Sequence, residues 1–600
     1  MRILLAGVAQ TLGRASARQL IAAGHEVCGI DVADDPRLDP RVAVTVADLE
    51  DPVLDDLAAD ADVIIHLDID ASGVPGVLAV SDAAGRAGSR LLCVLPAAGD
   101  PNDYRDAEEL VTSGWAPSLV IRIAPLLGRN PESMVCRTVS SLRRRGATAS
   151  VRVLHTDDLV RFLTRAVGSH RTGTVDLAAD EPISALHARR LLAATDIGFR
   201  HRAGWAGLDQ SCRLLPLQRD WDFECGWTAT AAVVDTARGL CARSHRCVEP
   251  PTRVTDPSAA EPVGEFDDVI SPDFPVFIAP DDGPLAAPLR PLSLDVHSGG
   301  LGCAQRAVAE VLGLSGALGA EWTHRATAVF GQRLYAGLSV AAAASTVLPG
   351  RSADALSQAP AGGPDVVLLP GPAVAPHRRI ALAAVNTRLL ALAGRYGTEC
   401  DALAADVATD ADEDVAPAGL SDARLQVRIL LLRDRIAQAW TTTALGLLIE
   451  DTLGAAPGRR HLAQWSRGLA AAASVLELSA LPEEVVPGDL DGGGAGRTPI
   501  VGRLLDTARS GRTGAWQSTV GQLQRLAETA DEVGRRMAAV RALADPADVH
   551  FLLCDELTAQ PVDTRLRVKR RRADWDRLAA LTMPTLIDGH WEPTENKAIS

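Results

Sequence analysis

Short apolar runs alternate with segments of helical spacing over the first part of the chain. The runs have the length of strands, and helices are expected between them, among others at 73–88 and 107–113. Strands and helices in alternation are typical of a parallel sheet covered on both faces. The pattern therefore predicts an α/β, Rossmann-like, doubly wound parallel sheet. Its predicted strands are Ile3–Ala6, Val27–Asp31, Val42–Val46, Asp62–Leu67, Leu91–Leu95 and Leu119–Ile123.

The second half has a helical pattern rich in alanine, which predicts a compact bundle. A proline-rich stretch without an apolar period separates the halves and is interpreted as a linker. We expect a domain at 1–240, a linker at 241–267 and a mainly α-helical domain at 268–600. The predicted helices are Trp322–Val347, His377–Arg395, Leu420–Leu453, Arg460–Leu478, Ile500–Ser510 and Trp516–Ala544.

The first predicted βαβ unit carries a glycine turn. Gly7 and Gly13 flank the turn, and Asp31 ends the second strand. In dinucleotide-binding units, glycines let the backbone approach a pyrophosphate at a helix N-terminus, and the acid holds a ribose diol. Gln10 stands where the motif has its middle glycine, so a side chain is expected where the phosphate would lie. Nucleotide binding therefore stays open.

Composition narrows the classes of partner. The 600 residues predict two or three domains, and the net charge of −16 works against binding nucleic acid or an anionic membrane. The basic run Arg567–Arg572 is interpreted as a solvated helix face. The ten cysteines form no CxxC pair, and no metal site is expected.

Two features of the chain bear on targeting and on membrane insertion. The N-terminus has no basic segment followed by a separate apolar stretch, because its apolar residues belong to the first strand. The alanine-rich stretch Leu334–Pro349 is shorter than the roughly 20 residues of a bilayer span. We expect a soluble cytoplasmic protein with a small-molecule substrate.

Seven stretches resemble, in order and spacing, the extended short-chain dehydrogenase/reductase family of the NAD-dependent epimerase/dehydratase type. The resemblance covers residues 1–240 and implies an NAD(P) cofactor, with Asp31 and Asp48 contacting the adenosine ribose and the adenine. It also raises the expectation of a homodimer. The stretches are GVAQTLG, AGHEVCGID, VADLED, ADVIIHL, VIRIAPLLGRNP, VRVLHTDDLVRFL and ECGWTAT.

The family's catalytic residues are incomplete in this chain. Relatives use a tyrosine and a lysine four residues later; Tyr104 lies in the matching region, but Glu108 takes the place of the lysine. A carboxylate there would raise the pKa of the tyrosine. Pro96 and Ala97 occupy the place of the family's serine. Tyr104 is thus a catalytic candidate or an exposed loop residue.

Asp68 and Asp70 follow the strand that ends near His66. The carboxyl end of a parallel strand lies at the crevice where doubly wound sheets bind ligands. Two acids facing one pocket could form an acid/base pair without a redox cofactor. Alternatively, one caps the next helix and the other is solvated. His66 is interpreted as a hydrogen-bonded core histidine.

The helical half resembles the central helical region of phosphoenolpyruvate-utilising enzymes of the pyruvate-water dikinase and rifampicin phosphotransferase type. The flanking ATP-grasp and phosphohistidine domains of those enzymes are not expected here, so no phosphoryl-transfer machinery is expected. Fusions of this kind resemble actinobacterial proteins of lipid and polyketide metabolism. The matching stretches are GEFDDVISPDFPVF, PLRPLSLDV, FGQRLYAG, ADVHFLLCDEL and RRRADWDRLAALTMPTLIDG.

Arg333 and Tyr335 are candidate substrate-binding residues in this half. They are expected to share one helix with His324 and Arg325. A pocket lined by Arg333 and Tyr335 could bind an anionic or carbonyl group, or the two side chains could tie helices together.

Three hypotheses of function result. The first is an enzyme with a degenerate dehydrogenase site that dehydrates, cyclises or isomerises a polyketide- or lipid-like hydroxy-carbonyl metabolite without net redox, using Asp68 and Asp70. The second is an NAD(P)-dependent reductase or epimerase that depends on Tyr104. The third is a non-catalytic binding or scaffold protein.

Overall fold

The computed structural model describes most of the chain, and two compact units are recognised in it. Unit 1 comprises Met1–Ala242, Pro417–Leu430 and Asp555–Thr564, and unit 2 comprises the rest. The described residues are 1–67, 73–97, 101–130, 133–144, 149–193, 221–240, 264–280, 287–345, 377–412, 415–454, 462–481, 499–591 and 594–595.

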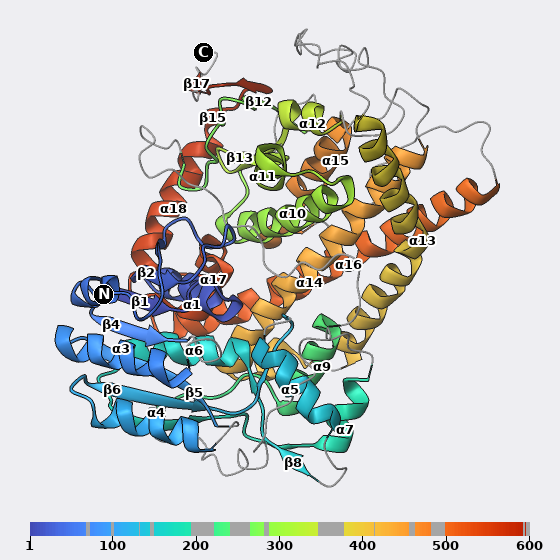
Figure 1. The fold of residues 1–600 in the computed structure, drawn as a ribbon. Helices are drawn as coiled ribbons and strands as arrows, with labels where there is room; N and C mark the ends of the chain where they lie inside the picture. The colour runs from blue at the N-terminus through green and yellow to red at the C-terminus, as the bar shows by residue number, and fades with distance from the viewer. Residues whose placement is uncertain are drawn as a thin grey trace. The chain divides into compact units, whose positions relative to one another are not determined.

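Unit 1 is built on a seven-stranded sheet with the order β10-β6-β5-β4-β1-β2-β3, in which all neighbouring strands run parallel (Figure 1). This is a Rossmann-like, doubly wound sheet, and the strand order reverses between β1 and β4. The six predicted strands are confirmed, whereas β10, short and partly exposed, was not predicted. The strands are β1 (Arg2–Ala6), β2 (Glu26–Asp31), β3 (Ala43–Val46), β4 (Val63–His66), β5 (Arg90–Pro96), β6 (Ser118–Ile123) and β10 (Gly173–Leu177).

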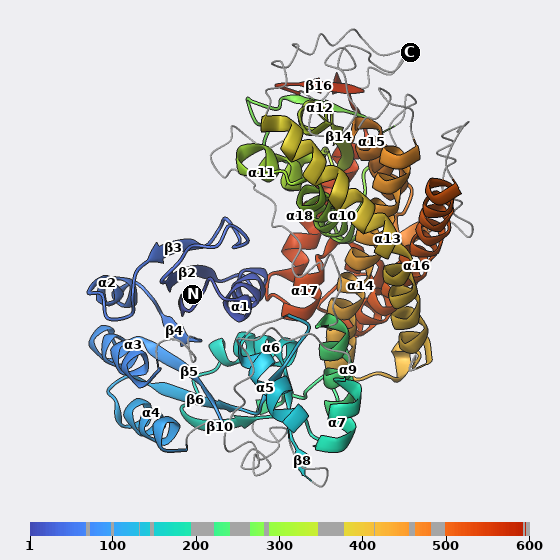
Figure 2. The ribbon, with the colours of Figure 1, turned by 45° about the vertical axis from the view of Figure 1, so that its right-hand side comes forward.

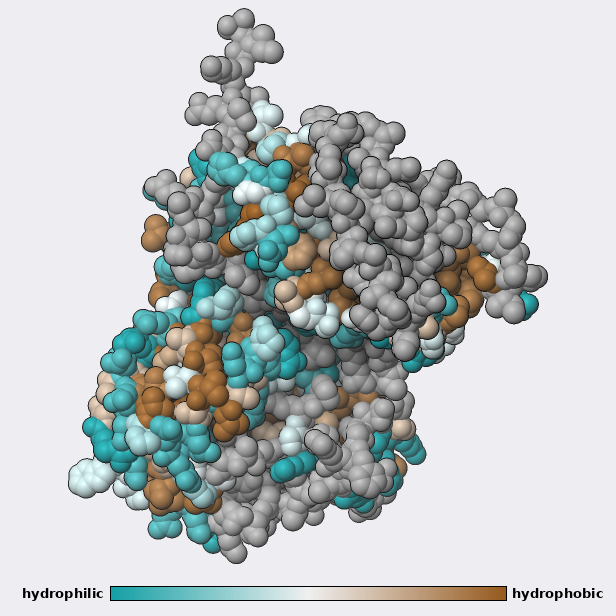
Figure 3. Space-filling view, turned by 45° about the horizontal axis from the view of Figure 1, so that its top comes forward, coloured by the Kyte–Doolittle hydropathy of each residue, from teal (hydrophilic) through white to brown (hydrophobic). Residues whose placement is uncertain are grey.

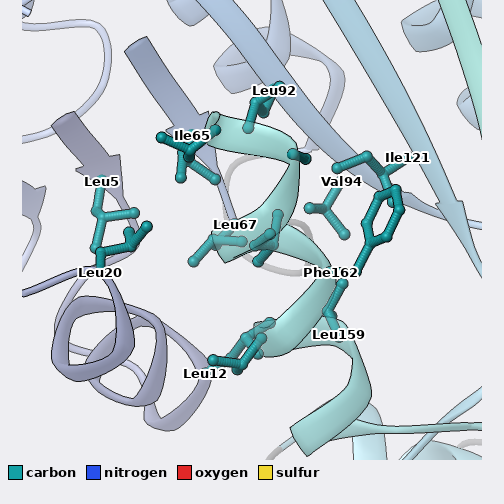
Figure 4. Close-up of a cluster of buried hydrophobic side chains, with 14 of the residues drawn as sticks. Leu5, Leu12, Leu20, Ile65, Leu67, Leu92, Val94, Ile121, Leu159 and Phe162 are labelled. Carbon is teal, nitrogen blue, oxygen red and sulfur yellow. The ribbon is translucent and has the colours of Figure 1, made fainter. Parts of the chain in front are cut away.

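Helices cover both faces of the sheet (Figure 2). On one face, residues such as Leu5 pack with Leu20 of α1 and Phe162 of α6 in a fully buried cluster (Figure 4). On the other face, Leu4 belongs to a second cluster with residues of α2, α3 and α4. Successive strand residues point to opposite faces, which explains why these strands are apolar throughout. The helices are α1 (Thr11–Ala22), α2 (Val53–Ala59), α3 (Gly73–Ala87), α4 (Pro101–Ser113) and α6 (Thr156–Val167).

Two segments from far along the chain complete unit 1. One is the start of α14 (Asp422–Ile449), where Gln426 accepts a hydrogen bond from Arg161 Nε at 2.9 Å. The other includes most of α17 (Cys554–Ala559), where Asp555 accepts a hydrogen bond from Gln19 Nε2 at 2.8 Å. The sheet is therefore stabilised by side chains more than 200 residues away in sequence.

Unit 2 is mainly α-helical, as predicted, and also contains a four-stranded antiparallel sheet of order β13-β14-β12-β16. Its strands are β12 (Val276–Ile278), β13 (Thr327–Phe330), β14 (Arg333–Gly337) and β16 (Leu586–Asp588). Its helices are α10 (Pro291–Leu312), α11 (Gly316–Arg325), α12 (Leu338–Ser345), α13 (His377–Asp412), the greater part of α14, α15 (Leu462–Ser474), α16 (Pro499–Ala539) and α18 (Thr564–Ala579).

The predicted helix 322–347 is wrong. The segment contains the end of α11, the hairpin β13–β14 and α12. Gly331 and Gln332 have φ angles of +56° and +57°, the conformation of a tight two-residue hairpin turn. The short apolar stretches on either side fit strands and helices equally well by spacing, and the turn decides between them.

The helices predicted at 500–510 and 516–544 form the single helix α16. The helix continues through Gly511. A Cβ atom at this position would lie 2.5 Å from the Sγ atom of Cys400 on α13, so a larger residue would clash. The glycine therefore serves the close approach of two helices.

The basic run on α18 is not a wholly solvated face. Arg571 is buried and forms an ion pair with Glu265 at 2.9 Å, and Arg570 pairs with the same carboxylate. Arg572 pairs with Asp548. The interpretation of this run as a solvated face is wrong for Arg571, because long-range carboxylates neutralise it.

The described part of the surface seen in Figure 3 mixes hydrophilic and hydrophobic residues. Among the helices that the structure describes, none combines the length and the apolar character needed to cross a bilayer.

Candidate functional site

The glycine turn lies between β1 and α1, beside the point where the strand order reverses. Gly7 has a φ of +90° and donates its N–H to Ile30 O at 3.0 Å. A Cβ atom on Gly13 would lie 2.2 Å from Gly7 O, so only glycine allows the helix to pack on the turn. The two glycines predicted to bind a cofactor thus have the conformation and the close packing that such a turn requires.

Gln10 is the N-cap residue of α1. Its backbone is extended, with φ −72° and ψ 160°, a conformation that any L-residue adopts without strain. Its side chain makes no capping hydrogen bond to the helix. The replacement of the middle glycine by Gln10 therefore costs no backbone strain, and it adds an amide group beside the helix N-terminus.

Asp31 holds the turn from the end of β2. Its Oδ2 atom accepts a hydrogen bond from the N–H of Ala9 at 2.9 Å. Its Oδ1 atom has no hydrogen-bond partner among the residues that the structure describes. One carboxylate oxygen fixes the turn, and the other can accept a hydrogen bond from a ribose hydroxyl.

Arg14 and Asp35 extend this arrangement, and sequence reasoning missed both. Arg14 is buried, with Nη1 2.8 Å from Asp35 Oδ2 and also bonded to the carbonyl of Ala9. Ala9 is thus held on both sides: Asp31 accepts from its N–H, and Arg14 donates to its carbonyl. The available signal was an arginine directly after Gly13, in a helix without acids in its first turn.

Charged partners shift the titration of Asp35. Burial by itself raises the pKa of this carboxyl, but hydrogen bonds from Arg37 and the charge of Arg14 outweigh it and hold the pKa below its ordinary value. Asp35 is therefore an anion at neutral pH. Its single negative charge lies between the positive charges of Arg14 and Arg37.

Asp48 lies beyond the end of β3 and is exposed. It accepts a hydrogen bond from the N–H of Glu50 at 3.1 Å, so it also stabilises the turn that follows. Val32 and Val46, next to Asp31 and at the end of β3, expose 67% and 58% of their surface. This end of the sheet presents apolar surface beside carboxylates, a combination that suits a heterocyclic base.

The catalytic candidates lie partly outside the described residues. Asp68 and Asp70 belong to the segment 68–72, which the structure does not describe. Tyr104 is placed in α4 by its backbone, and its side chain is outside the described part. Their roles remain predictions.

Glu108, which the resemblance aligns with a lysine, is engaged with two strands. Its Oε1 atom accepts a hydrogen bond from Thr174 Oγ1 on β10 at 3.0 Å, and its Oε2 atom lies 3.7 Å from Arg122 on β6. Arg122 also pairs with Asp176 at 2.6 Å. Glu108 therefore shares one arginine of the sheet with Asp176, which is the nearer of the two carboxylates.

His66 is a core histidine, as interpreted from the sequence, but the expectation that it is hydrogen-bonded is wrong for the part of the chain that the structure describes. It is fully buried in β4, between Ala6 of β1 and Cys93 of β5, but neither ring nitrogen has a partner among the described residues. Burial lowers the pKa of His66 to about 4, so the ring is neutral at pH 7. The strand register places it between side chains that offer no strong hydrogen-bonding group.

A second polar cluster in unit 1 was also missed. His155 is fully buried; its Nδ1 accepts the N–H of Asp157 at 3.1 Å, and its Nε2 lies 3.1 Å from Asp235. Arg129 pairs with both carboxylates, and Trp227 stacks on the imidazole ring with centroids 4.3 Å apart. Two of the stretches that resemble the dehydrogenase family, VRVLHTDDLVRFL and ECGWTAT, contain His155 and Trp227, which was the available signal.

Asp157 remains ionised within this cluster. Burial raises the pKa of its carboxyl, but the charge of Arg129 outweighs that effect, and the pKa lies below its ordinary value. Through Asp235 Oδ2, which lies near both His155 and Arg129, the cluster connects the strand end at His155 to the helix that carries Asp235.

Arg333 and Tyr335 lie on strand β14 of unit 2, not on a helix as expected. Arg333 is buried and donates to the carbonyl of Leu578 at 3.2 Å. Tyr335 is fully buried and donates its O–H to the carbonyl of Pro584 at 2.8 Å. Burial raises the pKa of Tyr335, so it stays a neutral donor. Arg333 therefore ties β14 to the last turn of α18, and Tyr335 ties it to the segment after that helix.

Among the described side chains, no three histidine, cysteine, aspartate or glutamate residues are grouped as a metal site would require. Within unit 1 the strand order, the reversal point and the glycine turn together define a Rossmann-like unit.

Comparison with known proteins gives relatives along the whole chain. No family model matches. Uncharacterized proteins of Mycobacterium tuberculosis (Rv2047c) and Mycobacterium bovis (Mb2073c) are each 26% identical over 734 aligned residues, which cover 100% of this chain and 85% of the relative.

Solved structures are similar over 40% of the chain. They include UDP-glucuronic acid 4-epimerase from Bacillus cereus in complex with NAD (14% identity, 96% of that chain, TM-score 0.30). The Bordetella bronchiseptica enzyme WbmG in complex with NAD is 17% identical over 93% of its chain, with a TM-score of 0.31. UDP-glucose 4-epimerase from Thermotoga maritima is 12% identical over 98% of its chain, with a TM-score of 0.32.

Proposed function

We propose that the protein is an enzyme that binds a nucleotide in the crevice of unit 1 and acts by acid/base chemistry without net redox. The observation that carries the proposal is the position of Glu108. A carboxylate engaged with Arg122 and Thr174 stands where a lysine would lower the pKa of the tyrosine and hold the nicotinamide ribose. The proton relay of a dehydrogenase lacks its cation.

NAD(P) fits the adenosine side of the crevice. Gly7 and Gly13 would leave room for the pyrophosphate, and Asp31 Oδ1 would accept a ribose hydroxyl. Gln10 would lie beside the phosphates, where its amide can donate a hydrogen bond. A bound nicotinamide would supply hydride chemistry, which the proposed reaction does not use.

The substrate proposed is a β-hydroxy-carbonyl metabolite of polyketide or lipid type. In its dehydration, one carboxylate takes the proton next to the carbonyl, and a second, protonated carboxyl gives a proton to the departing hydroxyl. The products are an enone and water. Asp68 and Asp70 are the proposed pair, since they follow β4 at the reversal of strand order. Cyclisation or isomerisation would use the same pair.

A second candidate is an NAD(P)-dependent reductase or epimerase. The geometry of Gly7, Gly13 and Asp31 favours it, with Tyr104 as the proton donor. A carboxylate at Asp31 would favour NAD over NADP, because it repels a 2′-phosphate. The likeness of the helical half to phosphoenolpyruvate-utilising enzymes, an actinobacterial setting in secondary metabolism and a homodimer also remain proposals.

The test uses the full chain, NADH or NADPH, and a panel of β-hydroxy ketones whose dehydration gives an ultraviolet-absorbing enone. We expect enone formation without oxidation of the nucleotide. We expect Asp68→Asn or Asp70→Asn to abolish it and Tyr104→Phe to leave it unchanged. Calorimetric titration measures nucleotide binding in parallel.

Other outcomes would replace the proposal. Nucleotide oxidation that disappears in Tyr104→Phe would establish the reductase. No turnover and no nucleotide binding by the folded protein, with another protein co-purifying at fixed stoichiometry, would establish a scaffold. Light scattering tests the homodimer independently.

A further inference from the structure

Three buried polar groups of unit 2 lie on two packed helices and have no hydrogen-bond partner among the described residues. They are Nδ1 of His297 on α10, and Nε1 of Trp440 and Oγ1 of Thr443 on α14. His297 and Trp440 are fully buried, and Thr443 is 4% exposed. Buried polar side chains in native proteins are nearly always hydrogen-bonded, so a group of three calls for a physical explanation.

The rings of His297 and Trp440 contact each other between α10 and α14. Their centroids are 5.9 Å apart, with the rings nearly perpendicular at 84°. A Cβ atom on Gly300, one helical turn after His297, would lie 2.5 Å from Cδ1 of Trp440. Cδ1 is bonded to Nε1, so the edge of the indole that carries the N–H lies against α10. Gly300 makes that approach sterically feasible.

The donor and acceptor roles of these atoms are defined. His297 Nε2 lies 2.7 Å from the carbonyl of Leu476, so Nε2 carries the proton and Nδ1 is an acceptor. Burial lowers the pKa of His297, which keeps the ring neutral. The indole Nε1–H of Trp440 is a donor only. The pair therefore offers one acceptor and one donor, both uncharged.

Thr443 differs from its two neighbours. Thr441 and Thr442 donate their hydroxyls to the carbonyls of Ala437 and Gln438 at 2.8 and 3.0 Å, as threonines in helices commonly do. Thr443 makes no such bond. Its hydroxyl is one turn from Trp440 on α14 and can both donate and accept.

We propose that His297, Trp440 and Thr443 form a binding subsite for the hydroxyl group of an uncharged, apolar ligand. A hydroxyl satisfies the pair in both directions, because its O–H donates to Nδ1 of His297 while its oxygen accepts from Nε1–H of Trp440. Trp516, whose ring centroid is 5.7 Å from that of Trp440, adds apolar surface for the body of the ligand. A charged group is disfavoured because none of the three polar side chains carries a charge.

This subsite belongs to unit 2 and does not rest on the nucleotide crevice or on Asp68 and Asp70. It goes beyond the proposed function by assigning the helical unit a ligand of its own. A single buried water could satisfy the same atoms, and the experiment distinguishes the two.

The probes are 4-fluorophenol and 4-fluorotoluene, which have similar shape and differ in the hydroxyl group. Binding to the full chain is followed by ligand-observed ¹⁹F NMR, and the indole N–H of Trp440 by ¹⁵N labelling of tryptophan. We expect saturable binding of 4-fluorophenol, at least tenfold weaker binding of 4-fluorotoluene, and a shift of the Trp440 indole signal only with the phenol.

The variants separate recognition from packing. Thr443→Val keeps the shape and removes the hydroxyl, and we expect weaker phenol binding without a lower melting temperature. Trp440→Phe removes the N–H and also some packing. Trp465→Phe is its control, because that buried indole already donates to Ala444 O at 3.0 Å. We expect Trp440→Phe to abolish the preference for phenol and Trp465→Phe to retain it.

Three results would overturn the proposal. They are equal binding of the two probes, no saturable binding of either with a long-lived water detected at the Trp440 indole, and phenol binding that Trp440→Phe and Thr443→Val leave unchanged. If Trp440→Phe fails to fold, Thr443→Val and the comparison of the two probes still test whether the subsite recognises a hydroxyl group.

Discussion

Asp31 and Ala9 are joined by a hydrogen bond of 2.9 Å from the Ala9 N–H to the Asp31 carboxylate. The bond connects the end of β2 to the glycine turn after β1, and so it fixes the acid that we propose for the ribose relative to the turn that we propose for the phosphates before any ligand arrives. Pre-organisation of this kind reduces the ordering that binding would otherwise require.

Replacing Asp31 should weaken both stability and nucleotide binding. Asp31→Ala leaves the Ala9 N–H without its acceptor, and we expect the free energy of unfolding to fall by about 1–3 kcal/mol. Urea unfolding measures the loss, and calorimetry measures NADH affinity. Asp34→Ala, three residues on and exposed, is the control and should change neither quantity. Unchanged affinity in Asp31→Ala would show that the acid does not contact the nucleotide.

The ion pair of Arg14 and Asp35 should make stability depend on pH. The pKa of Asp35 is lowered in the folded protein, so its contribution is present above the unfolded value of about 4 and is lost as the pH falls through the folded pKa. At pH 7 we expect Asp35→Asn to cost about 3 kcal/mol, because it leaves buried Arg14 without its carboxylate.

The difference between wild type and Asp35→Asn should therefore shrink below about pH 4. Urea unfolding at a series of pH values measures it, with Asp34→Asn as the matched variant on an exposed carboxylate. A difference that stays constant down to pH 3 would contradict the role of the Asp35 charge.

Gly226 should be intolerant of a methyl group. A Cβ atom there would lie 2.5 Å from the carbonyl of Ala423 and 2.7 Å from Val427, both on the α14 segment that completes unit 1. We expect overpacking in Gly226→Ala to reduce the free energy of unfolding by about 1–3 kcal/mol. The melting temperature should fall by several degrees as a result. Gly168→Ala is the control, since its nearest contact is an ordinary 3.7 Å. Equal melting temperatures would show that α14 does not pack there.

Gln332 should limit the stability of unit 2. It is a non-glycine residue at φ +57°, and both polar atoms of its buried amide are without a partner among the described residues. We expect Gln332→Gly to raise the free energy of unfolding by about 1 kcal/mol, because it relieves both costs. Gln560→Gly is the comparison, since Gln560 also has a positive φ but is exposed. Chemical denaturation of the two variants separates the cost of the positive φ from the cost of the buried amide. A lower free energy of unfolding in Gln332→Gly would contradict the prediction and would show that the amide is stabilised in the folded protein.

The parts of the fold that depend on local pattern were predictable. Each strand of the sheet except β10 forms an apolar run bounded by turns, and the glycine turn has a fixed spacing of residues. Gly7, Gly13 and Asp31 therefore lie where the sequence places them. The register that leaves the His66 ring without a hydrogen-bond partner among the described residues is not visible in a single strand, because it depends on which strands flank β4.

Contacts between distant residues were not predictable. Tyr335 donates to a carbonyl 249 residues away, so its hydrogen-bond partner could not be predicted from the spacing of nearby residues. The hairpin before it forms because Gly331 and Gln332 adopt positive φ angles, and glutamine is an unusual residue for that conformation. The single helix α16 likewise depends on a glycine whose purpose is seen only when α13 is packed against it.

The sequence by itself determined the fold class of the first unit and its glycine turn, because both follow from residue type and local spacing. Only the tertiary structure decided which side chains surround Glu108, how Arg14 and Asp35 fix the turn, and that α10 and α14 bury polar groups without a partner among the described residues. The physical reason is that hydrogen bonds and ion pairs act over a few ångströms in space, and only folding brings residues that are far apart in the chain within that distance.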